Sequence, residues 1–335
     1  MTDVPAGAIT AVVPLPSRGV AVAGRYRGVV DLGQGPLDRA TNAFVAVFDA
    51  RGHLEWSQTF STGLATGVDH GRDPGLVRAP GGDLVMRLSG LEPGVQVAAR
   101  PFGLVVRLTS AGQRRWERRW PDIRITSHVA TDTDTWLATE RDLVRLDAGG
   151  TEQARTKPEA LAPMELQLDP TGGIYLLGVA EKLPAVARTY AVERRSLQGE
   201  RIWRRTFGGR GQPFMHMATN VGGDALALIG QSDGPVDLEG EGALVGDTGG
   251  SFNFLYVVTP DGRVEGKALV NDVAWADSVA WTGNAVLVLG SSGAVPVDQQ
   301  SLNLVAFDRR GGKTKLTRFP GFVEARGQLA VLGQD

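Results

Sequence analysis

The feature that most constrains this chain is a short pattern that recurs seven times: an apolar strand, a tight turn and a second apolar strand that usually ends at glycine. The second strands end at positions spaced 39 to 66 residues apart. Repeats of this size, built from strands, are typical of a β-propeller, in which each repeat forms one blade. The recurring strands are residues 20–24, 84–90, 136–139, 174–178, 225–230, 285–290 and 329–333.

The second half of each repeat is a strand, a turn containing Asp or Gly, and an outer strand, and six copies of it are visible. Seven hairpins with six second halves predict an all-β propeller of seven blades, the last of them incomplete. Six blades are the alternative, with the hairpin at 329–333 as an appendage. Because a single blade cannot bury both of its faces, the blades must pack on one another. We therefore expect residues 1–335 to form one β-propeller domain.

Three outer strands carry Trp four residues after the turn glycine, at Trp56, Trp116 and Trp203. A large ring at one fixed position of a repeat predicts a wedge between neighbouring blades. The other interpretation is an aromatic platform for a ligand.

Composition excludes several classes of protein. The chain has no Cys, so it has no disulfides, thiolate metal sites or Cys nucleophiles. Its formal net charge of −2 gives no field that favours nucleic acid. No apolar run approaches the roughly 20 residues that span a bilayer, and residues 1–7 do not read as a signal peptide. The alternatives are a cytoplasmic protein or a mature domain with Met1 added.

Residues 24–60, 230–262 and 290–308 share a further pattern, in which a Gly-containing strand end leads through a loop with Asp to Asn and another apolar strand. This pattern resembles the SBBP-type bacterial β-propeller repeats. The resemblance covers about half of the chain directly. It implies a propeller and an exported or surface protein, and it implies no reaction.

The segment from Asp49 to Trp56 also resembles the docking motif of quinoprotein propellers and of the lipoprotein propeller of the outer-membrane assembly machine. The chain departs from the quinone enzymes because it has no vicinal Cys pair, is much shorter and carries one full motif. We therefore do not expect their activity.

His128, Glu165 and His216 occupy matching positions in the first strands of three consecutive repeats. First strands line the central channel of a propeller, so these side chains are candidates for a metal site, since two imidazoles and a carboxylate suit zinc or non-haem iron. The alternatives are polar residues along a wet channel, or His packed between blades with a backbone partner.

Residues 114–120 mix Arg and Trp, as surfaces that bind single-stranded nucleic acid do. The same alternation suits an exposed outer strand whose edge is protected by Arg. With a balanced net charge we favour the outer strand.

No phosphate-binding loop, nucleophile elbow or zinc-protease motif is present. We therefore predict a non-catalytic propeller with no catalytic residues, acting as a binding or assembly module for an unidentified protein or surface ligand. We expect a monomer without a transmembrane segment or a nucleic-acid partner, located outside the cell, on its surface or in the periplasm. The alternative is a metal-dependent or other enzyme with its site at His128, Glu165 and His216.

Overall fold

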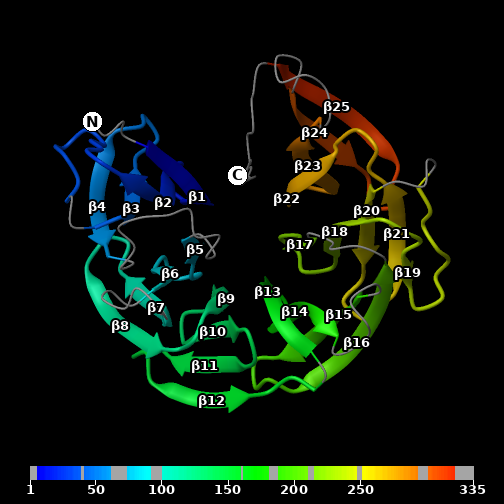
Figure 1. Cartoon of the computed structure of the whole chain (residues 1–335), viewed down its shortest axis with the longest axis horizontal. Helices are drawn as coiled ribbons and strands as arrows, with labels where there is room; N and C mark the ends of the chain where they lie inside the picture. Colours follow the sequence, from blue (N-terminus) through cyan, green and yellow to red (C-terminus); the bar gives the residue numbers. More distant parts are fainter. Residues whose placement is uncertain are drawn as a thin grey trace. The chain divides into compact units, whose positions relative to one another are not determined.

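The computed structural model describes residues 6–38, 41–61, 74–91, 100–159, 161–180, 188–209, 215–246, 251–292 and 301–320. Within these ranges the chain forms antiparallel strands and no helix. The strands make six sheets, each with four antiparallel core strands that follow one another in chain order (Figure 1). The fold is that of a six-bladed β-propeller, and we number the sheets as blades 1 to 6 along the chain.

The described residues fall into two compact units, which we describe separately. The first unit holds blades 1 to 3. Blade 1 is β1 Ala6–Pro14, β2 Val20–Arg27, β3 Ala43–Phe48 and β4 Leu54–Phe60; blade 2 is β5 Gly75–Arg78, β6 Leu84–Leu91, β7 Pro101–Leu108 and β8 Arg114–Pro121; blade 3 is β9 Ile125–Ala130, β10 Asp134–Thr139, β11 Leu143–Asp147 and β12 Glu152–Thr156.

The second unit holds blades 4 to 6. Blade 4 is β13 Leu161–Asp169, β14 Gly173–Ala180, β15 Arg188–Ser196 and β16 Arg201–Gly209, with β19 Asp237–Leu238 added at its edge; blade 5 is β17 Met215–Thr219, β18 Leu226–Ser232, β20 Phe252–Val258 and β21 Val264–Leu269; blade 6 is β22 Trp275–Thr282, β23 Ala285–Ser291, β24 Ser301–Phe307 and β25 Lys313–Pro320.

The prediction of seven blades is therefore wrong, and the six-blade alternative is the correct one. The described strands divide into six complete blades, since β1 already supplies the first strand of blade 1 and no described pair of strands is left over. The hairpin predicted at 329–333 lies outside the described residues. The prediction of a single domain over residues 1–335 stays a prediction.

The core lies between neighbouring blades. One apolar cluster joins blades 1 and 2, and others join blades 2 and 3, 4 and 5, and 5 and 6. The third strands β7 and β20 are buried along almost their whole length, whereas the fourth strand β8 is mostly exposed. This gradient explains why β7 and β20 consist mostly of apolar residues, whereas β8 is rich in Arg.

The turns between third and fourth strands follow the sequence pattern. The Asp49 carboxylate accepts hydrogen bonds from the backbone N–H of Arg51 and His53, both at 2.8 Å. Asp147 and Asp308 cap the equivalent turns of blades 3 and 6 in the same way. The glycine that follows has positive φ, 81° at Gly52, a conformation that side chains disfavour.

The prediction that the three Trp side chains are wedges is confirmed. The indole Nε1 of Trp56 donates to Ser110 O at 3.0 Å, and that of Trp116 donates to Ala148 O at 2.9 Å. Trp203 does the same to Pro260 O at 2.6 Å. Each acceptor lies in the turn of the next blade, so each Trp fastens its blade to the following one.

Candidate functional site

Glu165 and His216 lie in contact in the second unit. Glu165 is on β13 and His216 on β17, the first strands of blades 4 and 5, and His216 Nδ1 is 3.4 Å from Glu165 Oε2. The other carboxylate oxygen accepts the backbone N–H of Met217 at 3.0 Å. Of the three residues that the sequence aligned, the structure brings these two into contact.

The surroundings of His216 favour its protonated form. Partial burial lowers its pKa, but the hydrogen bond and the charge of Glu165, together with the charge of Asp277 on β22, outweigh burial and raise the pKa above the usual value. His216 is thus placed between carboxylates from the blades on either side of it. A cationic imidazole in this position joins three consecutive blades electrostatically.

His128 is in the other unit and in a different environment. It lies on β9, is buried, and its Nε2 is 2.8 Å from Val85 O on β6 of blade 2. Burial, reinforced by the charge of Arg87, lowers the pKa of His128 to about 3, although the bond to Val85 opposes the shift. His128 is therefore neutral at pH 7 and joins two blades through a backbone carbonyl, as one of the alternative interpretations of the sequence held.

Among the described residues no group of three His, Asp or Glu side chains is arranged to hold a metal ion. Glu165 and His216 place two potential metal ligands side by side. The Nε2 atom of His128 is hydrogen-bonded to the carbonyl of Val85. The metal site at His128, Glu165 and His216 stays a prediction.

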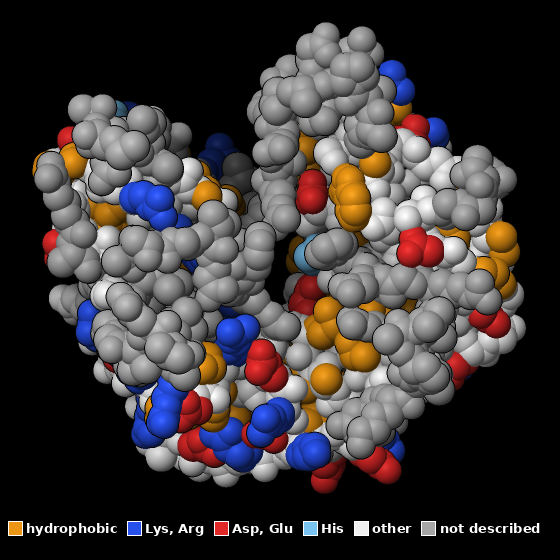
Figure 2. All heavy atoms as spheres, viewed as in Figure 1, with side chains coloured by type: hydrophobic (Ala, Val, Ile, Leu, Met, Phe, Trp, Pro, Cys, Tyr) orange, Lys and Arg blue, Asp and Glu red, His pale blue; other side chains and the backbone are white. Residues whose placement is uncertain are grey.

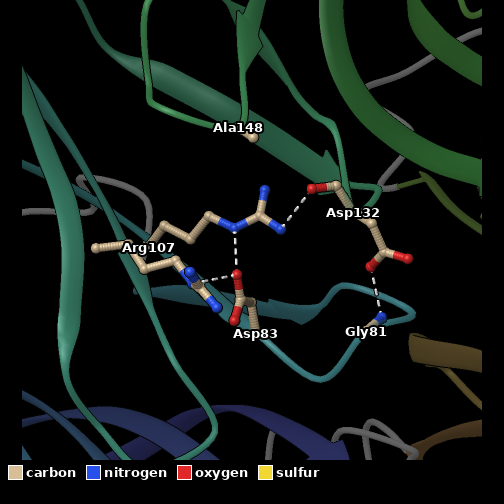
Figure 3. A pocket seen from close by; sticks show the side chains of 6 residues that line it. Gly81, Asp83, Arg107, Asp132 and Ala148 are labelled. Carbon is tan, nitrogen blue, oxygen red and sulfur yellow. Dashed lines mark hydrogen bonds and ion pairs between the residues drawn. The ribbon is translucent and has the colours of Figure 1, made fainter.

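A cavity of about 230 Å³ opens in the first unit at the junction of blades 2 and 3 (Figure 3). Its lining comes from the β5–β6 turn, β7, β8, the β9–β10 turn and the β11–β12 turn. The lining residues are Gly81, Asp83, Arg107, Arg115, Asp132 and Ala148.

Arg107 organises this cavity. Its side chain is 3 % exposed, and its Nε lies 2.8 Å from Asp83 Oδ2. Its Nη2 donates to Thr131 O and Asp132 O at 3.2 and 3.1 Å, so one guanidinium joins blade 2 to blade 3. Arg115 shares the Asp83 oxygen at 2.8 Å, but its side chain is 53 % exposed. Figure 2 shows basic and acidic side chains interspersed over these two blades (lower left).

Sequence reasoning missed this arrangement, although a signal was present. Arg107 interrupts an otherwise apolar third strand, and the same register position holds Arg145 in blade 3 and Arg194 in blade 4. Each pairs with an Asp near the first hairpin of its own blade: Arg145 with Asp134 at 2.7 Å and Arg194 with Asp169 at 2.7 Å. A charged residue repeated inside buried strands indicates a structural ion pair.

Most of the side chains that line the cavity are charged. Its lining contains guanidinium and carboxylate groups and no hydroxyl, thiol or imidazole. The cavity therefore presents hydrogen-bonding groups, fixed by ion pairs, with Arg115 as its half-exposed member.

The fold is a β-propeller, and comparison with solved structures agrees on this fold. The chain is similar to the Dos1 propeller, with a TM-score of 0.53 and 11 % identity over 93 % of this chain and 70 % of that one. It is also similar to the Pan2 WD40 domain of Neurospora crassa, with a TM-score of 0.45 and 10 % identity over 90 % of this chain and 76 % of that one.

An apocarotenoid oxygenase of Synechocystis matches with a TM-score of 0.45 and 8 % identity over 73 % of this chain and 68 % of that one. At these identities the likeness concerns the fold alone. No family model matches the chain. No curated protein matches it either. Within the described residues, we find no helix long and apolar enough to cross a membrane.

Proposed function

We propose that this chain is a non-catalytic β-propeller that binds a partner, as an assembly or scaffolding module. The observation that carries the proposal is the cavity between blades 2 and 3, whose lining holds fixed ion pairs and a half-exposed guanidinium but no hydroxyl, thiol or imidazole. Propellers serve many functions, so the fold alone would not support this conclusion. The lining chemistry does, because it suits recognition of a polar surface.

The proposal has further parts, of which the location rests on the resemblance to SBBP-type repeats. The chain is proposed to act as a monomer, as one domain over residues 1–335, and outside the cell, on its surface or in the periplasm. The partner is a protein or a surface ligand.

Affinity capture with the immobilised full chain, followed by titration of the captured partner, tests the proposal. We expect Arg115→Glu to weaken binding of that partner, because the half-exposed guanidinium becomes an anion, while the exposed turn variant Arg51→Glu binds as the parent does. A chain that captures no partner, or one whose binding ignores both variants, contradicts this role for the cavity.

The contact of His216 with Glu165 favours one alternative, a metal-dependent site. Metal analysis of protein purified without chelator or histidine tag separates the two functions. The binding module is expected to carry substoichiometric metal. One metal per chain, lost in both His128→Ala and His216→Ala, would establish the alternative.

A further inference from the structure

Blade 4 has a fifth strand that comes from another blade. β19 lies between the second and third strands of blade 5 and pairs antiparallel with the outer strand β16 of blade 4. Leu238 pairs with Phe207, and Asp237 pairs with Gly208. The edge of a propeller blade in this protein therefore accepts an added strand.

The added strand lies in an acidic segment, and the strand that it pairs with is basic. Beside the strand pair, Glu239 accepts the backbone N–H of Thr206 at 2.8 Å through Oε1. Its other oxygen, Oε2, is 3.3 Å from Nη1 of Arg205 on β16. The added segment, residues 237–241, contains three acidic residues, and β16 contains Arg201, Arg204 and Arg205. Backbone pairing thus comes with ion pairing along the edge.

β8 of blade 2 is the counterpart of β16. Trp116 and Trp203 occupy the same register position, opposite Arg107 and Arg194 of the third strands. By this alignment Arg118 corresponds to Arg205. β8 is also the outer strand of its sheet, and no described strand pairs with its outer edge.

The reason for this difference lies in the next blade. In blade 5 the connection between the second and third strands, which carries β19, spans residues 233–251. In blade 3 the same connection is the short turn Glu140 to Asp142, between β10 and β11. Blade 3 therefore has no segment in this connection that can extend over the edge of β8.

The arginines of β8 differ in how they are engaged. Arg114 pairs with Glu117, Arg115 pairs with Asp83 at 2.8 Å, and the Arg119 guanidinium stacks 3.8 Å from the centroid of the Phe102 ring. The Arg118 side chain is exposed and has no ion-pair or hydrogen-bond partner in the part of the chain that the structure describes. Its counterpart Arg205 holds the carboxylate of the added strand.

We propose that the outer edge of β8 binds an extended acidic segment of a partner protein, which adds a fifth strand to blade 2 as β19 does to blade 4. Main-chain hydrogen bonds provide the affinity of such strand addition, and side chains provide its specificity. The acidic residue nearest Arg118 takes the place that Glu239 has beside Arg205. Pro121 lacks an N–H, so pairing ends before it. This inference rests on the proposed binding function and names its surface and the chemistry of the partner.

The test uses the full chain and a fluorescein-labelled peptide that alternates Val with Glu. Its control peptide alternates Val with Gln. Anisotropy titrations measure affinity, and hydrogen exchange locates the site. We expect the Glu peptide to bind and to slow exchange of backbone amides within Arg114–Pro121. Binding should weaken about tenfold in Arg118→Glu, because an attraction becomes a repulsion, and remain near the parent value in Arg118→Lys and Arg51→Glu.

Four results would overturn the proposal: no binding of the Glu peptide, equal binding of both peptides, equal loss in Arg118→Glu and Arg51→Glu, or protection outside β8. Stronger binding of a single-stranded oligouridylate to the same edge would assign it to nucleic acid instead. Arg118→Gln, which removes the charge without reversing it, should give an intermediate affinity. If an identified partner binds independently of Arg118 but depends on Arg115, the binding function stands and the β8 edge is not its site.

Discussion

Trp116 lies against Gly150 so closely that a Cβ on this glycine would be 2.7 Å from Cδ2 of the indole. Gly150 is in the β11–β12 turn of blade 3 and has a φ of 80°. Trp56 lies against Gly112 and Trp203 against Gly262 in the same way. A Cβ added to these glycines would be 2.7 and 3.2 Å from Cδ2 of the indole, respectively. The glycine thus has two roles. It allows the positive φ of its turn, and it leaves room for the indole ring of the preceding blade.

Gly52 separates these two roles, because it occupies the same turn position in blade 1 with a φ of 81°, yet a Cβ added to it would meet no described atom within 4 Å. Gly52→Ala should lower the free energy of unfolding by about 1 kcal/mol, for the backbone conformation alone. Gly150→Ala should lower it by about 2–3 kcal/mol, because the ring must also move. Urea unfolding monitored by fluorescence measures both, and equal losses would mean that the indole contact carries no free energy.

Substitutions of Trp116 divide the wedge into its parts. Trp116→Phe keeps most of the ring and removes the hydrogen bond to Ala148, so it should lower the free energy of unfolding by about 1 kcal/mol. Trp116→Ala should lower it by about 3 kcal/mol, the lower end of the range for aromatic truncation, because the ring is half-buried. Identical values for the two variants would contradict a packing role.

Arg107 and Arg145 form a matched pair, since both sit at the same register of a third strand and their side chains are 3 % and 28 % exposed. In Arg107→Ala, Asp83 keeps only Arg115 as a partner. The carbonyls of Thr131 and Asp132 lose their donor. We expect a loss of about 3 kcal/mol, the lower end for breaking a buried pair. Arg145→Ala should lose about 1 kcal/mol, because solvent replaces its partner more readily. Thermal and urea unfolding check the order of the two.

His128 should make the protein less stable in acid. Its pKa is about 3 in the folded chain and about 6.5 when unfolded. Between these values the unfolded state binds a proton that the folded state does not, so stability falls as pH falls, by at most about 1.4 kcal/mol per pH unit. Unfolding between pH 6.5 and 5, where few carboxylates titrate, should show this slope in the parent protein and a smaller one in His128→Gln. The same slope in the parent protein and in His128→Gln would show that His128 does not cause the loss of stability in acid.

His216 should act in the opposite direction. Its pKa is raised in the folded chain, so its stabilising contribution is fully present below the unfolded value and is lost as pH rises through the folded one. The side chain is 40 % exposed, so the contribution is about 0.5 kcal/mol after screening. An NMR titration should find the pKa of the His216 imidazole above its usual range in the parent protein and lower in Glu165→Gln. An unchanged value would show that Glu165 does not hold the proton.

Repetition explains what could be predicted from the sequence. Strands, turn caps and the wedge role of Trp56 recur at fixed offsets, so each copy supports the others. Glu165 and His216 were singled out as candidates for the same reason, since they occupy matching positions of two repeats. The number of blades was not predicted correctly. The sequence does not say whether the hairpin at 329–333 adds a blade to the six that β1 to β25 form.

Other features escaped prediction in whole or in part. β19 is two residues long within an acidic, glycine-rich loop, and its pairing with β16 has no periodic signal. A backbone partner for His128 was one interpretation of the sequence, but no residue pattern identifies the carbonyl of Val85 as that partner. Arg107 did have a signal, an Arg inside a buried strand, but its role required knowing that Asp83 and Asp132 lie at the same junction.

Blade 2 contributes a glycine to one Trp–Gly contact and a tryptophan to the next. Its Gly112 packs against Trp56 of blade 1, and its Trp116 packs against Gly150 of blade 3. A stretch of gene encoding this blade therefore encodes two complementary ends. Tandem duplication of that stretch would yield copies that already fit head to tail, without new mutations at the joint. The contact thus offers a physical route by which such an array lengthens, and a starting module for assembling propellers from one repeated blade.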